Sequence, residues 1–292
     1  MRRRYEWKIR STSIQLGDHT LLMGILNVTP DSFSDGGKYI DPDRAYARAI
    51  ELEDQGADII DIGAESTRPG SLRINEGEEL RRLVPVLKRL KNNLSIPICV
   101  DTYKAAVAEK AIEHGAEIIN DPSGLTWDPS LAKVVSNANA GIILNHMRGT
   151  PETWAKLPPI KDVMSAVAVD LEATIHRAVR AGIDKARIVV DPGLGFGKRK
   201  EQNTEMLARL QELVRLHTPM MLGPSRKSFL ARPTERETAF ANAAAVTASI
   251  LAGAHIVRVH EVAEMKIAAQ FADAVLMGIP EIKMDAEVRD RR

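Results

Sequence analysis

The chain has 292 residues, with 40 Lys and Arg against 39 Asp and Glu, so its formal net charge is close to +1. This balance argues against a surface that wraps nucleic acid, which would carry a clustered excess of Lys and Arg, and no apolar run approaches the roughly 20 residues of a membrane span. The single cysteine, Cys99, excludes an internal disulfide framework and fits a reducing compartment, so we expect a cytoplasmic protein.

The N-terminus carries a basic cluster, residues 2–4, that no apolar stretch follows; this argues against a signal peptide and predicts a solvated basic end. Residues Tyr5–His19 alternate apolar and polar side chains, which predicts a short β-hairpin that plugs the bottom of the domain that follows. The expected organisation is a hairpin or extension over residues 1–19, one barrel domain over residues 20–279 and a charged C-terminal tail over residues 280–292.

Short apolar runs then alternate with longer segments of helical period. Because strands that are buried on both faces read as continuous branched apolar runs, these runs predict buried parallel strands. The predicted strands are Leu21–Val28, Asp58–Gly63, Ile96–Asp101, Glu117–Asp121, Gly141–His146, Arg187–Asp191, Pro219–Gly223 and Ala254–Val259. The helical segments between them include Asp43–Gln55, Asn75–Lys91, Tyr103–His114, Val163–Ala181, Glu201–His217 and Glu237–Leu251.

Eight strand–helix units of this size predict an α/β fold of the (β/α)8 TIM-barrel type. The alternative is an open, doubly wound sheet, which usually carries a glycine fingerprint after its first strand. The first predicted strand is followed instead by the long loop Asn27–Gly37, which lacks that fingerprint. The sequence therefore favours the barrel.

Each predicted strand ends in residues that can hydrogen-bond or carry charge. One such Asp or Asn alone is as well explained by a helix cap or a turn, but active sites of these barrels lie at the carboxyl ends of the strands. Asp101, Asn120 and Asp191 would together suit a flat heterocycle with several N–H donors and carbonyls. A second set of side chains would suit a phosphate or pyrophosphate because it is cationic: Arg68, Lys227, Arg258 and His260.

Other chemistries fit less well. The glycine-rich run Asp191–Lys198 matches neither nucleotide-binding spacing, so we interpret its glycines as a tight turn beneath a ligand. The segment His260–Glu264 lacks the second His of a zinc-binding helix. Cys99 lies inside an apolar strand, which predicts a buried, inert thiol rather than a nucleophile.

The motifs at these strand ends resemble the dihydropteroate synthase family. The matching segments follow one another in order through nearly the whole chain: Met23–Gly37, Asp61–Gly70, Val100–Thr102, Ile118–Asp121, His146–Gly149, Asp191–Gly193 with Phe196–Lys198, Ser225–Ser228, and Gly253–His260. The resemblance implies an enzyme of folate biosynthesis that joins 7,8-dihydropterin-6-ylmethyl diphosphate to 4-aminobenzoate and releases pyrophosphate. It also implies a homodimer that acts on small molecules, requires Mg²⁺ and is a target of sulfonamides.

The resemblance further implies a role for individual residues. The pterin would be held by Asp101, Asn120, Asp191 and Lys227, in a slot lined by Met147, Phe196 and Gly223. The pyrophosphate would be bound by Arg68, Arg258, His260 and Asn27, with Asn27 coordinating the Mg²⁺. The aminobenzoate would be accepted by Phe33, Thr67, Pro69 and Ser228. The residues expected to act in catalysis are Asp101, Lys227, Arg258 and His260.

Departure of pyrophosphate is the difficult step of this reaction, because the aromatic amine is uncharged and needs no strong base. Cations would stabilise the charge of the leaving group, which predicts an SN1-like path with no covalent enzyme intermediate. Two alternatives are a pterin-binding methyltransferase-type barrel, which does not explain Asn27–Gly37 or Ser225–Ser228, and a catalytically silent pterin-binding paralogue. A silent paralogue should have lost Asn27, Arg68 or Lys227, and all three are present.

Overall fold

The structure is a computed structural model that describes residues 2–29, 41–66 and 70–278. Strands β1 (Tyr5–Lys8) and β2 (Ser13–Leu16) form the predicted antiparallel hairpin. The larger sheet has eight parallel strands in the order β8-β7-β6-β5-β4-β3-β10-β9. These strands are β3 (Leu21–Asn27), β4 (Ile59–Gly63), β5 (Ile98–Asp101), β6 (Ile118–Asp121), β7 (Gly141–Asn145), β8 (Ile188–Asp191), β9 (Met221–Leu222) and β10 (Ile256–Val259).

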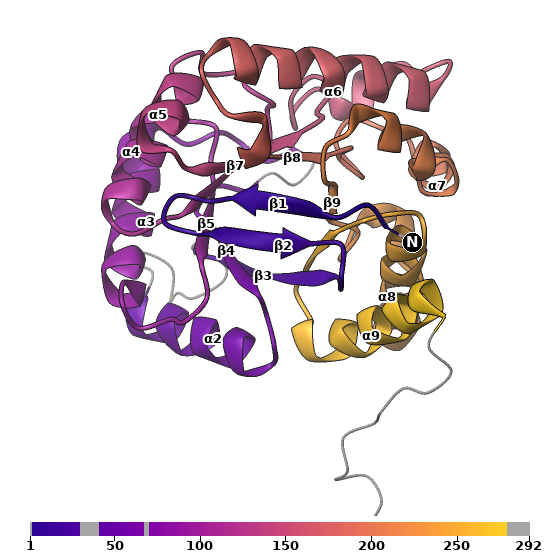
Figure 1. The fold of residues 1–292 in the computed structure, drawn as a ribbon, viewed down its shortest axis with the longest axis horizontal. Helices are drawn as coiled ribbons and strands as arrows, with labels where there is room; N and C mark the ends of the chain where they lie inside the picture. The colour runs from indigo at the N-terminus through magenta and orange to yellow at the C-terminus, as the bar shows by residue number, and fades with distance from the viewer. Residues whose placement is uncertain (1, 30–40, 67–69, 279–292) are drawn as a thin grey trace, which may run out of the picture.

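The eight-stranded sheet closes on itself. A parallel bridge between Val190 and Met220 joins β8 to the residue before β9, and the Val190 N–H donates to the Pro219 carbonyl at 3.0 Å. Helices connect and surround the strands (Figure 1). The predicted (β/α)8 barrel is therefore confirmed, and each predicted strand contains one of the observed strands.

The α-helices are α2 (Pro42–Asp54), α3 (Glu76–Leu90), α4 (Ala105–Glu113), α5 (Leu131–Ala138), α6 (Val163–Arg180), α7 (Lys200–Ala208), α8 (Glu235–Leu251) and α9 (Val262–Met277). The 3-10 helices are η1 (Trp154–Lys156), η2 (Lys185–Arg187), η3 (Leu210–Leu216) and η4 (Ser228–Leu230). The single helix predicted over residues 201–217 is wrong, because α7 ends at Ala208 and η3 follows it. None of the helices within these described ranges combines the length and apolar character that crossing a bilayer requires.

The barrel has two separate apolar cores. The outer core lies between the sheet and the helices, where for example Leu83, Leu87 and Leu90 of α3 are buried. The inner core contains one or two residues from each barrel strand, and Trp7, Ile9 and Leu16 of the hairpin segment pack against them. The hairpin thus covers the N-terminal end of the barrel (Figure 1), as predicted.

The expectation of a fully solvated basic end is wrong for Arg2. Its side chain is 4% exposed, and its guanidinium donates to Thr20 Oγ1 at 2.5 Å, to the Ala254 carbonyl at 2.6 Å and to Asp273 Oδ1 at 2.7 Å. Asp273 lies on α9, so this contact joins the N-terminus to the last helix. The basic pattern alone did not reveal a carboxylate more than 250 residues away in the sequence.

Replacing Trp7 with alanine should destabilise the barrel without touching its opposite end. The indole is fully buried, and its Nε1 donates to the Arg187 carbonyl at 2.9 Å. We expect the free energy of unfolding to fall by about 3–5 kcal/mol, as for other buried Trp-to-Ala changes, in urea titrations followed by circular dichroism. The control Val179→Ala, on the exposed face of α6, should change it by less than about 0.5 kcal/mol. Equal effects would contradict the role of the hairpin as a plug.

Candidate active site

Polar side chains replace apolar ones at the carboxyl end of the barrel interior. Side chains alternate between the two faces of a strand, so residues two apart point the same way. On six strands a residue of the inner core is followed two positions later by a charged or amide side chain. The pairs are Ile59 and Asp61, Cys99 and Asp101, Ile118 and Asn120, Ile143 and Asn145, Val189 and Asp191, and Ile256 and Arg258. The strand register places Asn27, Gly63, Asp101 and Asn120 in one row across β3 to β6.

Arg258 links the acidic side chains of this site. Its Nε donates to Asp61 Oδ2 at 2.5 Å and its Nη2 donates to Asp101 Oδ2 at 3.0 Å. Asn120 Nδ2 donates to the same Asp61 oxygen at 3.1 Å. Asp61 is fully buried, whereas the side chains of Asp101 and Arg258 are 17% and 19% exposed. One guanidinium therefore joins residues from β4, β5 and β10.

The environment of Asp101 disfavours its ionised form. Burial raises the pKa of Asp101 to about 7, Arg258 opposes the rise and the Asp61 carboxylate adds to it. Burial also disfavours the charge of Arg258, but Asp61 and Asp101 outweigh it and raise the pKa of the guanidinium, which stays charged. The Asp101 carboxyl thus titrates near neutral pH, where it can accept or donate a hydrogen bond.

A second group of predicted residues lies on β8 and on the loop after β9. The Lys227 ammonium is 3.9 Å from the centre of the Phe196 ring, and Asp191 Oδ1 accepts a hydrogen bond from the Gly193 N–H at 2.7 Å. Burial lowers the pKa of Lys227 to about 8, Arg258 lowers it further, and Asp191 and Asp101 oppose this. Burial raises the pKa of Asp191, with Lys227 among the opposing charges. Because these charges act on one another, they belong to one site.

His260 follows β10 and is held from two sides. Its Nδ1 is 2.9 Å from Ser225 Oγ, and its backbone carbonyl accepts from Arg48 Nη2 at 3.2 Å. Ser225 begins the segment that contains Lys227 and Ser228. The contact between His260 and Ser225 therefore joins the loops after β9 and β10, and Ser228 begins the short helix η4 on the exposed side.

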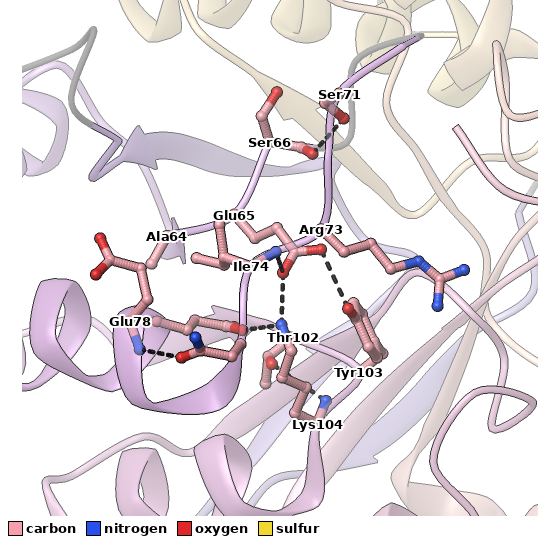
Figure 2. Close-up of polar contacts among 12 residues, drawn as sticks. Ala64, Glu65, Ser66, Ser71, Arg73, Ile74, Glu78, Thr102, Tyr103 and Lys104 are labelled. Atoms are coloured by element: carbon pink, nitrogen blue, oxygen red, sulfur yellow. Dashed lines mark hydrogen bonds and ion pairs between the residues drawn. The ribbon is translucent and has the colours of Figure 1, made fainter. Parts of the chain in front are cut away.

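Glu65, two residues after β4, is the centre of a buried ion cluster (Figure 2). Its carboxylate accepts from Lys104 Nζ at 2.5 Å, from the Tyr103 hydroxyl at 3.2 Å and from the Ile74 N–H at 3.3 Å. The same ammonium pairs with Glu79 of α3, whose side chain is 1% exposed. One carboxylate in the segment that leaves β4 thus contacts both the segment that leads into α3 and the segment between β5 and α4.

Further contacts hold the same two segments together. The Ser71 hydroxyl donates to the Ser66 carbonyl at 2.6 Å (Figure 2), and Arg82 of α3 donates to the Ala64 carbonyl at 3.0 Å. The Gly70 N–H donates to the Pro151 carbonyl at 3.1 Å, which ties this segment to the region after β7. Residues 64–66 and 70–74 therefore have defined positions at the mouth of the barrel.

The structure brings most of the predicted site residues to one end of the barrel. Asp101, Asn120 and Arg258 belong to one hydrogen-bonded cluster. Asp191, Lys227 and Phe196 lie beside it, and a Cβ placed on Gly223 would be 3.7 Å from Arg258 Cβ. Asn27 ends β3, and Met147 follows β7 after His146. Four predicted residues lie outside the described part of the chain: Phe33, Thr67, Arg68 and Pro69.

Sequence reasoning gave Asp61 no role of its own. The residue begins the motif Asp61–Gly70. It lies two positions after Ile59 of the inner core, so its side chain points to the same inner face of the barrel. That spacing was the available signal, but only the fold shows that Arg258 and Asn120 both reach its Oδ2. The Lys104–Glu65–Glu79 cluster was missed for the same reason.

A magnesium ion carried by a phosphate group would fit this site. Mg²⁺ usually takes one or two protein oxygens and otherwise binds substrate phosphates and water. Among the described residues no cluster of three or more His, Cys, Asp or Glu could hold a metal, but Asn27 supplies a hard amide oxygen in the same row as Asp101. The amide oxygen of Asn27 therefore fits a Mg²⁺ ion that enters the site together with a phosphate group of the substrate.

Comparison with known proteins agrees with this geometry. The model of the family described as pterin binding enzyme matches residues 23–260. The dihydropteroate synthase of Bacillus subtilis is 43% identical over 270 residues, which cover 91% of this chain and 92% of that protein. The dihydropteroate synthase of Synechocystis is 41% identical over 271 residues, which cover 91% and 94%.

Solved structures show the same likeness. The Clostridium difficile dihydropteroate synthase in the presence of pteroic acid has a TM-score of 0.83 and 44% identity, and the match covers 89% of this chain and 98% of that one. The Xanthomonas albilineans enzyme with 4-aminobenzoic acid has a TM-score of 0.86 and 37% identity, with 94% and 99% covered. The chain belongs to the dihydropteroate synthase family of pterin-binding enzymes.

Proposed function

We propose that this chain condenses 7,8-dihydropterin-6-ylmethyl diphosphate with 4-aminobenzoate to give 7,8-dihydropteroate and pyrophosphate. The observation that carries the proposal is the cluster of Asp101, Asn120 and Arg258, with Lys227 and Asp191 beside it, at the carboxyl end of the barrel. The relatives with this activity cover nearly the whole chain. One relative's structure in the presence of pteroic acid and another's with 4-aminobenzoic acid support these two substrate classes.

The pterin would bind through groups that already have defined partners. Asn120 uses its amide nitrogen on Asp61, so its amide oxygen is left for a ligand N–H. Asp101 and Asp191 add further acceptors, and the Lys227 ammonium adds a donor between them. The slot would be completed by Met147, Phe196 and Gly223. Because every polar edge of a buried heterocycle needs a partner, this set would select against rings with fewer N–H groups.

The leaving diphosphate would meet Arg258 and His260, with Arg68 and Asn27. The bond from the methylene carbon to the diphosphate oxygen breaks first, and its electron pair goes to that oxygen. The lone pair of the aromatic amine then forms the new carbon–nitrogen bond, and the amine gives up one proton to the released pyrophosphate or to water. Cations fixed at the site of developing charge stabilise such a departure. Phe33, Thr67, Pro69 and Ser228 would hold the aminobenzoate during this step.

The burial of Cys99, the single cysteine of the sequence, supports a path without a covalent enzyme intermediate. Cys99 is fully buried, and burial together with the neighbouring Asp61 carboxylate raises the pKa of its thiol well above the usual value. A thiol in this state is a poor nucleophile. Rapid-quench trapping of a pterin covalently attached to the protein would contradict the proposed path.

Asn27 would hold the Mg²⁺ that accompanies the diphosphate, and the bound ion would neutralise part of the phosphate charge. We therefore expect Mg²⁺ to increase the affinity for the pterin diphosphate in the wild-type protein, but much less in Asn27→Ala. Isothermal titration calorimetry with and without EDTA measures this difference without relying on turnover. An undiminished Mg²⁺ effect in the variant would show that Asn27 is not the ligand.

The decisive experiment measures pyrophosphate release with the pterin diphosphate, in the presence and absence of 4-aminobenzoate. Release that depends on both compounds, together with formation of dihydropteroate, is the expected result. Lys227→Ala should weaken both pterin diphosphate binding and turnover. A methyltransferase-type barrel or a silent paralogue would bind pterin but release no pyrophosphate, and unchanged constants for Lys227→Ala would contradict its placement.

We also propose that the protein is a cytoplasmic homodimer. The single cysteine, which can form no internal disulfide, supports the cytoplasmic compartment. Ile267, Phe271 and Val275 are spaced four residues apart on one face of α9, and each is more than half exposed among the described residues, as is Phe240 of α8. Such an apolar patch is typical of an interface.

We expect Phe271→Glu to shift the mass measured by light scattering from that of a dimer to that of a monomer. The control Val179→Glu on α6 should leave the mass unchanged. A monomeric wild type would overturn the proposal.

A further inference from the structure

Lys198 ends the glycine-rich segment after β8, and its ammonium binds three backbone carbonyls. Its Nζ donates to Gly193 at 2.7 Å, to His146 at 3.1 Å and to Phe196 at 3.3 Å. Three N–H groups thus meet three acceptors, and among residues whose positions are defined Lys198 has no salt bridge to a carboxylate. The Gly193 carbonyl also accepts from the Phe196 N–H at 3.1 Å. The Lys198 ammonium therefore matters most for the His146 and Phe196 carbonyls, because an unpaired buried carbonyl is costly.

These three carbonyls belong to the two loops that carry predicted residues of the pterin slot. His146 immediately precedes Met147, and Phe196 is itself a predicted slot residue. The two loops also lie very close, since a Cβ on Gly193 would be 2.0 Å from the His146 carbonyl oxygen. Lys198 is therefore a side chain whose single ammonium binds the backbone of both the loop after β7 and the loop after β8.

The Phe196 ring occupies a defined position next to this contact. Trp154 packs edge-on against it with ring centres 5.5 Å apart, and the Lys227 ammonium is 3.9 Å from its centre. The charge on Lys198 is costly in this place, because desolvation, followed by the Lys227 and Arg148 cations, lowers its pKa to about 7 while Asp191 opposes the shift. The three hydrogen bonds to backbone carbonyls therefore explain why the Lys198 ammonium lies near the Lys227 and Arg148 cations.

We infer that Lys198 is a positioning residue that fixes Met147 and Phe196 in the pterin slot and so sets the affinity for the bicyclic substrate. It does not touch the reacting atoms. The inference rests on the proposed function, since it assumes that the slot binds a pterin. It gives Lys198 a role different from that of Lys227, which faces the substrate.

The loops should keep their overall path when Lys198 is changed. The Gly195 N–H donates to Asn203 Oδ1 at 2.6 Å, and Arg148 Nη1 donates to the Gly197 carbonyl at 3.3 Å. These contacts are independent of the Lys198 ammonium. Loss of Lys198 is therefore expected to loosen the slot locally rather than to unfold the barrel.

The test compares Lys198→Met, which removes the donors, with Lys198→Arg, which retains charge and donors, and with Lys200→Met, an exposed lysine two residues further on. We expect Lys198→Met to raise the Kd for the pterin diphosphate about tenfold or more, as the loss of about 1.4 kcal/mol would. The KM for 4-aminobenzoate at saturating pterin diphosphate should change less than twofold. Lys198→Arg should recover part of the affinity, and Lys200→Met should match the wild type.

Two outcomes would overturn the inference. One is a wild-type Kd for the pterin diphosphate in Lys198→Met, and the other is an equal rise of both substrate constants, which a general structural defect would produce. If Lys198→Met fails to fold, Lys198→Gln and Lys198→Arg provide the same comparison of the two constants. A wild-type protein that binds no pterin diphosphate would instead refute the proposed function, so the two failures are distinguishable.

Discussion

Replacing Arg258 with alanine should reduce turnover by about 10²–10³-fold, the usual cost of removing one electrostatic contact to developing charge. The change also leaves Asp61 and Asp101 without the cation that lies 2.5 and 3.0 Å from them. Removing one partner of a buried ion pair leaves uncompensated charge, so the free energy of unfolding should fall by about 3 kcal/mol. Steady-state kinetics and urea titration measure the two effects.

The same variant should change the pH dependence in a defined direction. Arg258 opposes the rise in the pKa of Asp101, so without it the Asp101 carboxyl should stay protonated to higher pH.

If Arg258 acts mainly on the leaving group, kcat should fall more than the affinity for a pterin that lacks the diphosphate. An equal loss in both would contradict that role. Arg209→Ala, which removes a cation that is ion-paired at the surface, is the matched control and should have little effect.

Replacing Asp101 with asparagine should lower kcat/KM by about 10- to 150-fold, as expected for a lost hydrogen bond to a charged group. The same change should stabilise the ligand-free fold at alkaline pH. Burial raises the Asp101 pKa from 3.8 to about 7. Between these values the folded protein holds a proton that the unfolded chain has lost, so stability falls as the pH rises through this window. Above pH 7 the buried carboxyl is ionised, and the full free-energy cost of its charge is present in the folded protein. Asparagine carries no charge and removes this cost.

Urea titrations at pH 5 and pH 8 test this sign. The variant should exceed the wild type at pH 8 by on the order of 1 kcal/mol, and the difference should shrink at pH 5. Asp184→Asn is the matched control of opposite sign, because a hydrogen bond from the Ala186 N–H lowers the pKa of Asp184 and its loss should not stabilise the fold at pH 8. Equal or lower stability of Asp101→Asn at pH 8 would show that Asp101 is not strained in the empty site.

The fold could be predicted from the sequence because each barrel strand is a local signal. The strands are buried on both faces, so runs such as Ile59–Gly63 and Ile188–Asp191 are almost entirely apolar until the residue that reaches the mouth. The hairpin was equally visible from its alternation. The break between α7 and η3 was not, because Leu210, Leu213 and Leu216 keep a helix-like spacing through it.

The site was predictable only in part, for a physical reason. The types of residue at the strand ends indicate which groups are available, but not which of them pair in the empty protein. Asp61, Arg258 and Asn120 are brought together by register and closure. Lys104 meets both Glu65 and Glu79 only because α3 and α4 lie side by side. Such pairings depend on the packed fold and leave no periodic trace in the sequence.

The burial of Cys99 has a practical consequence for measurements in solution. It is the only cysteine of the chain, it is fully buried, and the pKa of its thiol is raised well above the usual value by burial. Thiol-directed dyes and spin labels should therefore ignore the native protein and react at a cysteine placed on its surface. Leu72→Cys, at a position 80% exposed within the anchored segment 70–74, would carry a single spectroscopic reporter at the barrel mouth without any other change to the sequence.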